Sequence, residues 1–112
     1  MPVGFVAMAI PEITVDDLAE RLAAGATLVD VREQVEYDEA HVGGAVLVPL
    51  ATVPDNLDAF RSDGPTYVIC KSGGRSMRAC EFVARHGIEV VNVAGGTLAW
   101  LMSGREYVSG AA

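Results

Sequence analysis

Basic side chains are scarce in this 112-residue sequence, which has 8 Lys and Arg against 15 Asp and Glu and a formal charge of −7. It contains no run of Lys or Arg. Nucleic acids and anionic membrane surfaces both need a basic footprint, so neither is expected as the main partner. Any anionic ligand must therefore be bound by local geometry rather than by the overall charge.

Cysteine is scarce as well, because the chain has only Cys70 and Cys80, ten residues apart. Two cysteines at this separation cannot form the disulfide framework of a small secreted domain, so free thiols in a reducing compartment are expected. The apolar segment 1–10 has no charged region before it and about half of the ~20 residues that a membrane span needs. We therefore expect neither a signal peptide nor a membrane helix, and a cytoplasmic protein.

Metal-ligand patterns and repeats are also lacking. The histidines, His41 and His86, and the two cysteines fall at no recognised ligand spacing, so no metal and no cofactor are expected. No low-complexity tract or linker divides the chain, and 51% of its residues are hydrophobic. These features predict one folded domain with a single core.

Short apolar runs rich in β-branched residues alternate with helical patterns along the chain. Such runs are typical of strands buried on both faces of a sheet. Strands are predicted at residues 27–31, 45–48, 66–69 and 88–93. Helices are predicted at residues 15–24, 33–40, 75–86 and 97–102, with one or two short helices within 50–61. The sequence therefore predicts an α/β domain with a mainly parallel central sheet and helices on both faces.

Cys70 directly follows the predicted strand at 66–69, at the sheet edge where ligands of parallel α/β domains collect. The five residues after it include two glycines, so the chain can curl tightly and turn several backbone N–H groups toward one point. Such a loop binds anions and favours a thiolate over a thiol. Cys70 is thus the candidate nucleophile, held firmly and facing solvent. Cys80 lies in mid-helix among apolar residues, where packing is the predicted role.

Positive charge is concentrated around this loop. Residues 70–86 sum to +3, so the rest of the chain sums to −10. The four basic residues are Lys71, Arg75, Arg78 and Arg85. We expect them to draw small anions through an otherwise repelling surface field.

Four motifs, in order, resemble those of single-domain rhodaneses, members of the sulfurtransferase family. They are Leu28-Val-Asp-Val-Arg32 followed by Glu36-Tyr37, His41-Val-Gly-Gly-Ala45, the Cys-x-x-Gly-x-Arg-Ser loop at 70–76, and Val93-Ala-Gly-Gly-Thr-Leu-Ala-Trp100 with Gly104. The resemblance covers residues 13–107. It implies a rhodanese-like three-layer α/β fold, with one domain over residues 1–112: a core at 10–107, an N-terminal extension at 1–9 and a tail at 108–112.

The resemblance also implies a reaction. Cys70 would take sulfane sulfur from a donor such as thiosulfate, become a persulfide, and pass the sulfur to cyanide or to a thiol, including that of a thioredoxin-like protein. The backbone N–H groups of the loop would stabilise the persulfide anion. The substrate-binding residues would be Lys71, Ser72, Gly73, Gly74, Arg75 and Ser76. Arg75 is equally consistent with a structural clasp across the loop.

Asp30 and Arg32 are predicted to support the site. Asp30 could reach the Cys70 loop or cap the next helix, and Arg32 could pair with Asp30 or Glu36. Structural roles are favoured for both, because sulfur transfer needs no proton relay once the thiolate has formed. His41 is predicted to make hydrogen bonds in a turn, and Trp100 to pack the last helix onto the sheet.

Two other functions share parts of this pattern. Cysteine-based phosphatases and arsenate reductases place the arginine six positions after the cysteine and phosphatases have a histidine before it, whereas Arg75 is five positions after Cys70 and Ile69 precedes it. A sulfur carrier or regulatory partner-binding domain is the other alternative; a loop that has lost its cysteine would favour it. The pair Lys71-Ser72 matches neither the thiosulfate nor the mercaptopyruvate pattern of the family, so the donor stays open between thiosulfate and a persulfide.

Overall fold

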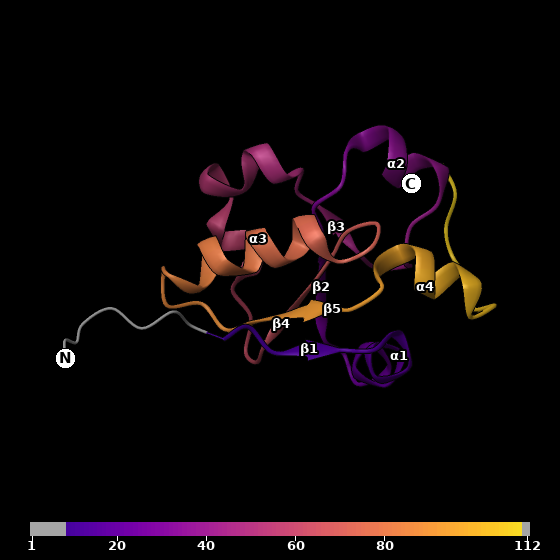
Figure 1. Ribbon diagram of the computed structural model, residues 1–112, viewed down its shortest axis with the longest axis horizontal. Coiled ribbons are helices and arrows are strands. Elements are labelled where there is room, and N and C mark those ends of the chain that lie inside the picture. Colours follow the sequence, from indigo (N-terminus) through magenta and orange to yellow (C-terminus); the bar gives the residue numbers. More distant parts are fainter. Residues whose placement is uncertain (1–8, 111–112) are drawn as a thin grey trace.

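The computed structural model describes residues 9–110 and has a five-stranded sheet between two layers of helices (Figure 1). The sheet order is β1-β5-β4-β2-β3, and each neighbouring pair is parallel. The strands are β1 (Glu12–Ile13), β2 (Thr27–Asp30), β3 (Val46–Leu47), β4 (Thr66–Ile69) and β5 (Val90–Val93). The predicted α/β class with a parallel sheet is confirmed.

The helices divide between the two faces of the sheet. They are α1 (Val15–Ala23), α2 (Gln34–Glu39), α3 (Gly74–Ala84) and α4 (Gly96–Met102), with the 3-10 helices η1 (Leu50–Asp55) and η2 (Leu57–Phe60). Side chains alternate across each strand, so Tyr67 and Ile69 of β4 pack in one core cluster while Val68 packs in the other. The first cluster includes residues of α1 and α4, and the second includes residues of α3, η1 and η2.

The first helix begins as the sequence predicts. The Thr14 side-chain oxygen accepts a hydrogen bond from the N–H of Asp17 at 3.2 Å, which satisfies one free N–H group of the first turn. The helix ends at Ala23, and Gly25 follows with φ of +95°, a left-handed conformation that glycine adopts without steric cost. These local signals fix both ends of α1.

Two strands differ from the prediction. The expected buried strand at 45–48 is only two residues long, and Val46 is 51% exposed, because β3 lies at the edge of the sheet. The other edge strand, β1, was not predicted at all. It pairs with β5, where the N–H of Asn92 donates to the carbonyl of Pro11 and the N–H of Ala94 donates to that of Ile13.

The expected N-terminal extension at 1–9 lies, apart from residue 9, outside the described residues. The C-terminal segment is held in place: Val108 pairs in antiparallel fashion with His41, and the N–H of Gly110 donates to the carbonyl of Asp38. Among residues 9–110, no helix has the length and apolar character needed to cross a membrane.

Candidate active site

Cys70 lies at the carboxyl edge of the sheet, immediately after β4. Its strand is flanked by β2 and β5, so the residues that follow these two strands surround the loop from both sides. The loop runs from Cys70 to Gly73 and leads directly into α3. The predicted sequence of strand, glycine-containing loop and helix is therefore present.

The loop is closed by Gly73, which has φ of +115° immediately before α3. Only glycine adopts this left-handed conformation readily. The Asn92 side-chain amide of β5 donates to the Gly73 carbonyl at 3.2 Å and to the Glu12 carboxylate of β1 at 2.8 Å. Asn92 thus ties the loop to two neighbouring strands.

The Cys70 sulfur accepts two hydrogen bonds from its own loop. The backbone N–H of Gly73 lies 3.1 Å from Sγ, and the Ser76 hydroxyl lies 3.2 Å from it. The residue is only 1% exposed, because the loop curls around the sulfur. The prediction that this side chain faces solvent is therefore wrong.

The two thiols have opposite electrostatic environments. Burial opposes ionisation of Cys70, but hydrogen bonds from the Ser76 hydroxyl and from the N–H groups of Ser76, Gly73 and Ser72 outweigh it and lower the pKa of this thiol. Burial without such donors raises the pKa of the Cys80 thiol to about 12. Cys80 lies fully buried in the core cluster under α3, as predicted, and both cysteines are free. The geometry therefore favours a thiolate at Cys70 alone.

The start of α4 holds the outer side of the loop. The N–H of Thr97 donates to the Cys70 carbonyl at 2.8 Å, and the N–H of Leu98 donates to the Lys71 carbonyl at 3.0 Å. This close approach requires Gly96, since a Cβ atom there would lie 2.6 Å from the Cys70 carbonyl oxygen. Gly96 also has φ of +59°, so two independent constraints select glycine.

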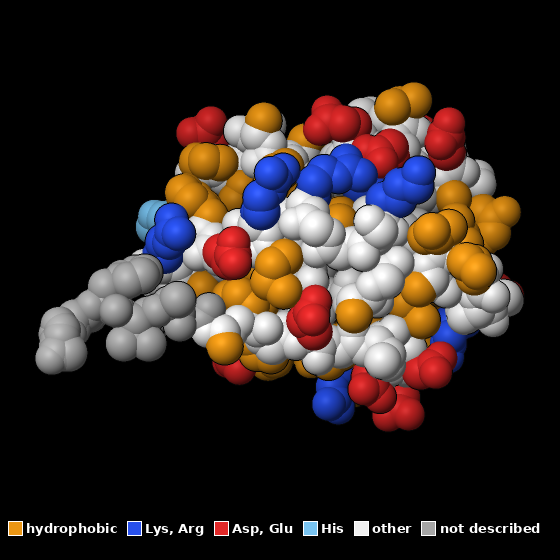
Figure 2. All heavy atoms as spheres, viewed as in Figure 1, with side chains coloured by type: hydrophobic (Ala, Val, Ile, Leu, Met, Phe, Trp, Pro, Cys, Tyr) orange, Lys and Arg blue, Asp and Glu red, His pale blue; other side chains and the backbone are white. Residues whose placement is uncertain are grey.

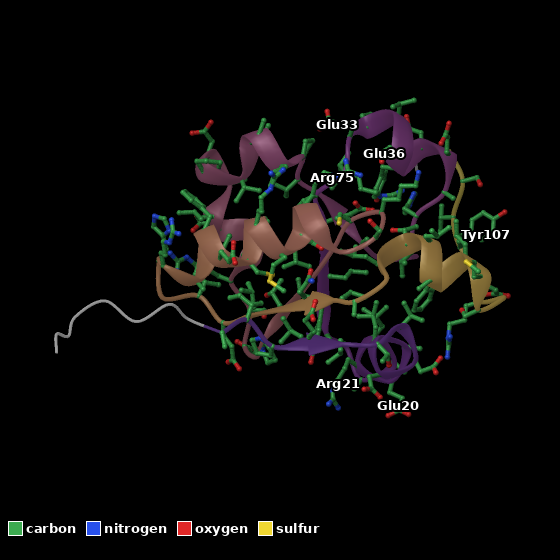
Figure 3. All side chains as sticks on the ribbon, in the orientation of Figure 1. Glu20, Arg21, Glu33, Glu36, Arg75 and Tyr107 are labelled. Atoms are coloured by element: carbon green, nitrogen blue, oxygen red, sulfur yellow. The ribbon has the colours of Figure 1, made fainter. Side chains whose placement is uncertain are left out.

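Arg75 makes an ion pair with Glu36 of α2. Its two terminal nitrogens lie 2.8 and 2.9 Å from the two carboxylate oxygens, and the side chains point toward one another in Figure 3. The Arg75 guanidinium lowers the pKa of the Glu36 carboxyl to about 2. Arg75 therefore clasps α3 to α2 rather than spanning its own loop, and the suggested pair of Arg32 with Glu36 is not formed.

Asp30 and Arg32 form a buried pair beneath α2. The Arg32 Nε and Nη2 atoms donate to both Asp30 oxygens at 2.8–3.1 Å, and Nη2 also donates to the Ala40 carbonyl. Asp30 is fully buried and Arg32 is 5% exposed. Helix α2 begins after Glu33, whose N–H donates to the Glu36 side chain, so the suggestion that Asp30 caps this helix is wrong.

A cavity of about 200 Å³ opens beside the Cys70 loop. Its lining consists of Arg32, Glu36, Glu39, Ala40, Lys71, Thr97, Leu98 and Leu101. The Thr97 hydroxyl is buried and has no hydrogen-bond partner among the described residues. A larger cavity of about 600 Å³ lies at the opposite, amino edge of the sheet, near Thr27 and Pro65, and does not approach the loop. The smaller cavity is thus the one placed to receive a ligand near Cys70.

His41 and Trp100 have the structural roles that the sequence predicts. His41 is 2% exposed, its Nδ1 lies 2.7 Å from the Tyr37 carbonyl, and its ring stacks on that of Tyr37 at 3.6 Å. Trp100 packs in the core cluster that includes Val91 and Val93 of β5. Within residues 9–110, no three His, Cys, Asp or Glu side chains are placed to share a metal ion.

Three residues near the loop have roles that the sequence prediction missed: Glu36 as the partner of Arg75, Asn92 as the link to β1, and Thr97 in the cavity lining. For two of these residues, the sequence itself contains a polar side chain at a position that could have drawn attention. Asn92 interrupts the apolar strand 90–93, and Thr97 follows two glycines at a strand end. The partners of Glu36 and Asn92, however, come from other elements and cannot be read from local patterns.

With this geometry established, comparison with known proteins identifies the fold. A family model described as the rhodanese-like domain matches residues 14–103. A Bacillus subtilis protein named "Putative sulfurtransferase YtwF" is 36% identical over 95 residues, which cover 83% of this chain and 92% of that protein. A protein of Allochromatium vinosum named "Sulfurtransferase" is 30% identical over 103 residues, which cover 89% of this chain and 96% of that protein.

A further relative from Bacillus subtilis, named "Putative sulfur carrier protein YrkF", is 34% identical over 97 residues, which cover 84% of this chain and 52% of that protein. Among solved structures, a rhodanese-like domain protein from Staphylococcus aureus superposes with a TM-score of 0.76 at 36% identity, over 81% of this chain and 91% of that one. The expected three-layer fold is thereby confirmed.

Proposed function

The chain belongs to the rhodanese-like domain family, and from this membership we propose that it is a sulfurtransferase that carries sulfane sulfur as a persulfide on Cys70. The observation that carries the proposal is the pair of hydrogen bonds to Sγ, from the Gly73 N–H at 3.1 Å and the Ser76 hydroxyl at 3.2 Å. Donors that converge on a sulfur stabilise its anion. Relatives named as sulfurtransferases support the same reaction class.

The first proposed step loads Cys70 with sulfur. The Cys70 thiolate attacks the outer sulfur of thiosulfate, a new S–S bond forms, and sulfite leaves with the electron pair of the broken S–S bond. The product is a Cys70 persulfide anion. The N–H groups of the loop surround the sulfur and can hold this anion in place. Backbone N–H groups stabilise an anion even on a protein that has no net positive charge.

The second proposed step unloads the sulfur. Cyanide attacks the outer sulfur of the persulfide, thiocyanate leaves, and the bonding electron pair returns to Cys70 as a thiolate. A thiol acceptor takes the same sulfur when its thiolate attacks. Neither step needs a general acid or base at the sulfur, which agrees with the pairing of Asp30 to Arg32 away from Sγ.

The other loop residues are proposed to bind and position the donor. The exposed Lys71 lines the cavity and can attract the sulfonate group of thiosulfate. Ser72, Gly73 and Ser76 donate backbone N–H groups to the Cys70 sulfur, and Gly74 begins α3 beside them. Arg75 adds a positive charge near the loop but acts chiefly by holding α2 through Glu36. Asp30 and Arg32 brace the floor of the cavity.

A sulfur-carrier role is the second candidate, because one relative is named a sulfur carrier protein. A carrier would load Cys70 and hand its sulfur only to a dedicated protein, whereas an enzyme would turn over with small acceptors. Repeated thiocyanate formation from thiosulfate and cyanide therefore favours the enzyme.

We also propose a reducing compartment such as the cytoplasm, since Cys70 and Cys80 are both free thiols. The proposed domain core is residues 10–107. The C-terminal segment packs against this core through Val108 and Gly110.

The decisive experiment is the mass of the intact protein after incubation with thiosulfate. We expect a gain of one sulfur (~32 Da) that is lost when a thiol is added, because a persulfide is a covalent intermediate. Cys80→Ser is the matched control and keeps the gain, while Cys70→Ser abolishes both the gain and thiocyanate formation. A sulfur gain that persists in Cys70→Ser would refute the assignment.

A further inference from the structure

A row of basic side chains leads along α3 to the Cys70 loop. Helical spacing places Arg75, Arg78 and Arg85 on one side of α3, and Lys71 precedes them in the loop. Figure 2 shows a row of Lys and Arg side chains, in blue, across this view of the molecule. We call these four residues the basic row. Lys71, Arg78 and Arg85 are exposed, and none of them has an ion-pair partner among residues 9–110. None of these three cations therefore has an ion-pair partner in the described chain, and the acidic residue of α3, Glu81, lies about one turn from both Arg78 and Arg85.

The basic row is longer than a small anion needs. Helix α3 has 11 residues, which at about 1.5 Å each extend over about 16 Å. A sulfonate group can contact Lys71 at the cavity mouth, but it cannot reach Arg78 and Arg85 at the same time. The row fits an extended ligand that bears several negative charges.

An apolar group lies on the other side of the loop. Leu98 and Met102 of α4 are 45% and 79% exposed, and the nearby Tyr107 is 53% exposed. We call these three residues the apolar rim; Figure 2 shows hydrophobic side chains, in orange, beyond one end of the blue row, at the side of the molecule where Figure 3 labels Tyr107. The hydrogen bond from the Leu98 N–H to the Lys71 carbonyl joins the rim directly to the basic row. Exposed apolar residues beside unpaired charges are typical of a protein-binding surface.

We propose that the basic row and the apolar rim together dock an acidic protein, which presents its own thiol to Cys70 as the sulfur acceptor. The rest of the chain sums to −10, so a long polyanion such as RNA would be repelled wherever it left the row. A protein with a local acidic patch places its negative charge against the basic row alone and so avoids repulsion by the rest of the chain. This inference rests on the proposed function, because the partner's thiolate attacks the outer sulfur of the Cys70 persulfide. A new S–S bond forms on the partner, the S–S bond to Cys70 breaks, and its electron pair leaves Cys70 as a thiolate and the partner as a persulfide anion.

The test uses two synthetic peptides that share one cysteine. One peptide flanks the cysteine with six glutamates and the other with six glutamines. We expect the sulfur-loaded protein to transfer sulfur to the glutamate peptide about tenfold faster at low salt, because electrostatic steering raises association rates. The advantage is expected to vanish near 1 M salt, where screening acts within about 3 Å.

Two charge reversals separate the docking surface from the net charge. Arg78→Glu removes one cation of the basic row, whereas Arg21→Glu makes the same change on α1, on the opposite face of the sheet. Arg78→Glu is expected to abolish the preference for the glutamate peptide, while transfer from the sulfur-loaded protein to the uncharged glutamine peptide still proceeds. Arg21→Glu is expected to keep the preference. Equal losses in the two variants, or no preference in the unmodified protein, would overturn the proposal.

A binding measurement keeps this test independent of sulfur chemistry. Versions of the two peptides with serine in place of cysteine carry a fluorescent label, and anisotropy reports their binding. Tighter binding of the glutamate peptide that is lost in Arg78→Glu supports docking even if Cys70 gains no sulfur, in which case only the proposed function fails. A labelled RNA oligomer that binds more tightly than the glutamate peptide would instead indicate a nucleic-acid partner and contradict the proposal.

Discussion

At the scale of single residues, the properties of Cys70 depend on the few groups that contact its sulfur. Burial alone would make this thiol as inert as Cys80, whose pKa burial raises to about 12. The difference comes from the donors of Ser76, Gly73 and Ser72, which lower the pKa of the Cys70 thiol despite its burial. Two thiols ten residues apart thus have pKa values shifted in opposite directions.

The Ser76 hydroxyl offers a direct test of this account. We expect Ser76→Ala to raise the pKa of Cys70, because Sγ loses a donor at 3.2 Å. A hydrogen bond to a charged group contributes about 1.5–3 kcal/mol, so alkylation of Cys70 by iodoacetamide at neutral pH should slow by about tenfold or more. The pH dependence of that rate is measured in a Cys80→Ser background. An unchanged profile would mean that the backbone N–H groups alone stabilise the thiolate.

At the scale of elements, the site is assembled where two helix starts meet one loop. Helix α3 follows the loop in sequence, whereas α4 reaches it from 26 residues beyond Cys70 and binds its carbonyl groups. The N–H groups of the loop are therefore held by the Cys70 sulfur, and its carbonyl groups accept hydrogen bonds from the start of α4. This arrangement makes Gly96, the first residue of α4, part of the site although it has no side chain.

The requirement for Gly96 predicts a large effect of a single methyl group. Gly96→Ala places a Cβ at 2.6 Å from the Cys70 carbonyl oxygen and imposes φ of +59° on alanine. We expect a loss of about 2–5 kcal/mol in the free energy of unfolding, measured by urea denaturation. Gly104→Ala is the matched control, since it also has a positive φ but meets no atom within 4 Å; its expected loss is about 1–2 kcal/mol. Equal losses would show that the approach of α4 to the loop tolerates a side chain.

At the scale of the whole molecule, the two faces of the sheet and both of its edges contribute to the site. Asn92 joins the Cys70 loop to β1 at one edge, and the Arg75 to Glu36 pair joins it to α2 near the other. The ion pair is half-buried, so solvent screens part of its strength. Its contribution should appear in the pH dependence of global stability.

The sign of that dependence follows from the direction of the pKa change. The pKa of Glu36 falls from 4.5 to about 2 on folding, so the stabilisation is complete above pH 4.5 and is lost as the pH falls toward 2. We expect Glu36→Gln to lower the free energy of unfolding by about 1–2 kcal/mol at pH 7 and by almost nothing near pH 2. Denaturant curves across this range measure the difference. Glu39→Gln, which changes an exposed glutamate of the same helix, should have little effect at any pH.

The sequence predicted correctly those features that depend on residues close to one another along the chain. Helical periodicity located α1, and the loop motif located Cys70 and its donors, since the donors lie within six residues of the sulfur-bearing residue. The two-residue strands β1 and β3 escaped correct prediction because their limits are set by pairing with distant strands. The partner of Arg75 escaped for the same reason, since Glu36 comes from another part of the chain.

The pairing of β1 with β5 has a consequence for how the chain folds. Its register joins Glu12 to Asn92, 80 residues apart, so forming it closes a loop of most of the chain. Long closures cost more conformational entropy than short ones and are slow to form. The donors to the Cys70 sulfur need only a short closure, whereas the Asn92 bridge to Glu12 needs the long one. We therefore expect the first strand of the chain to be the last to join the sheet during refolding.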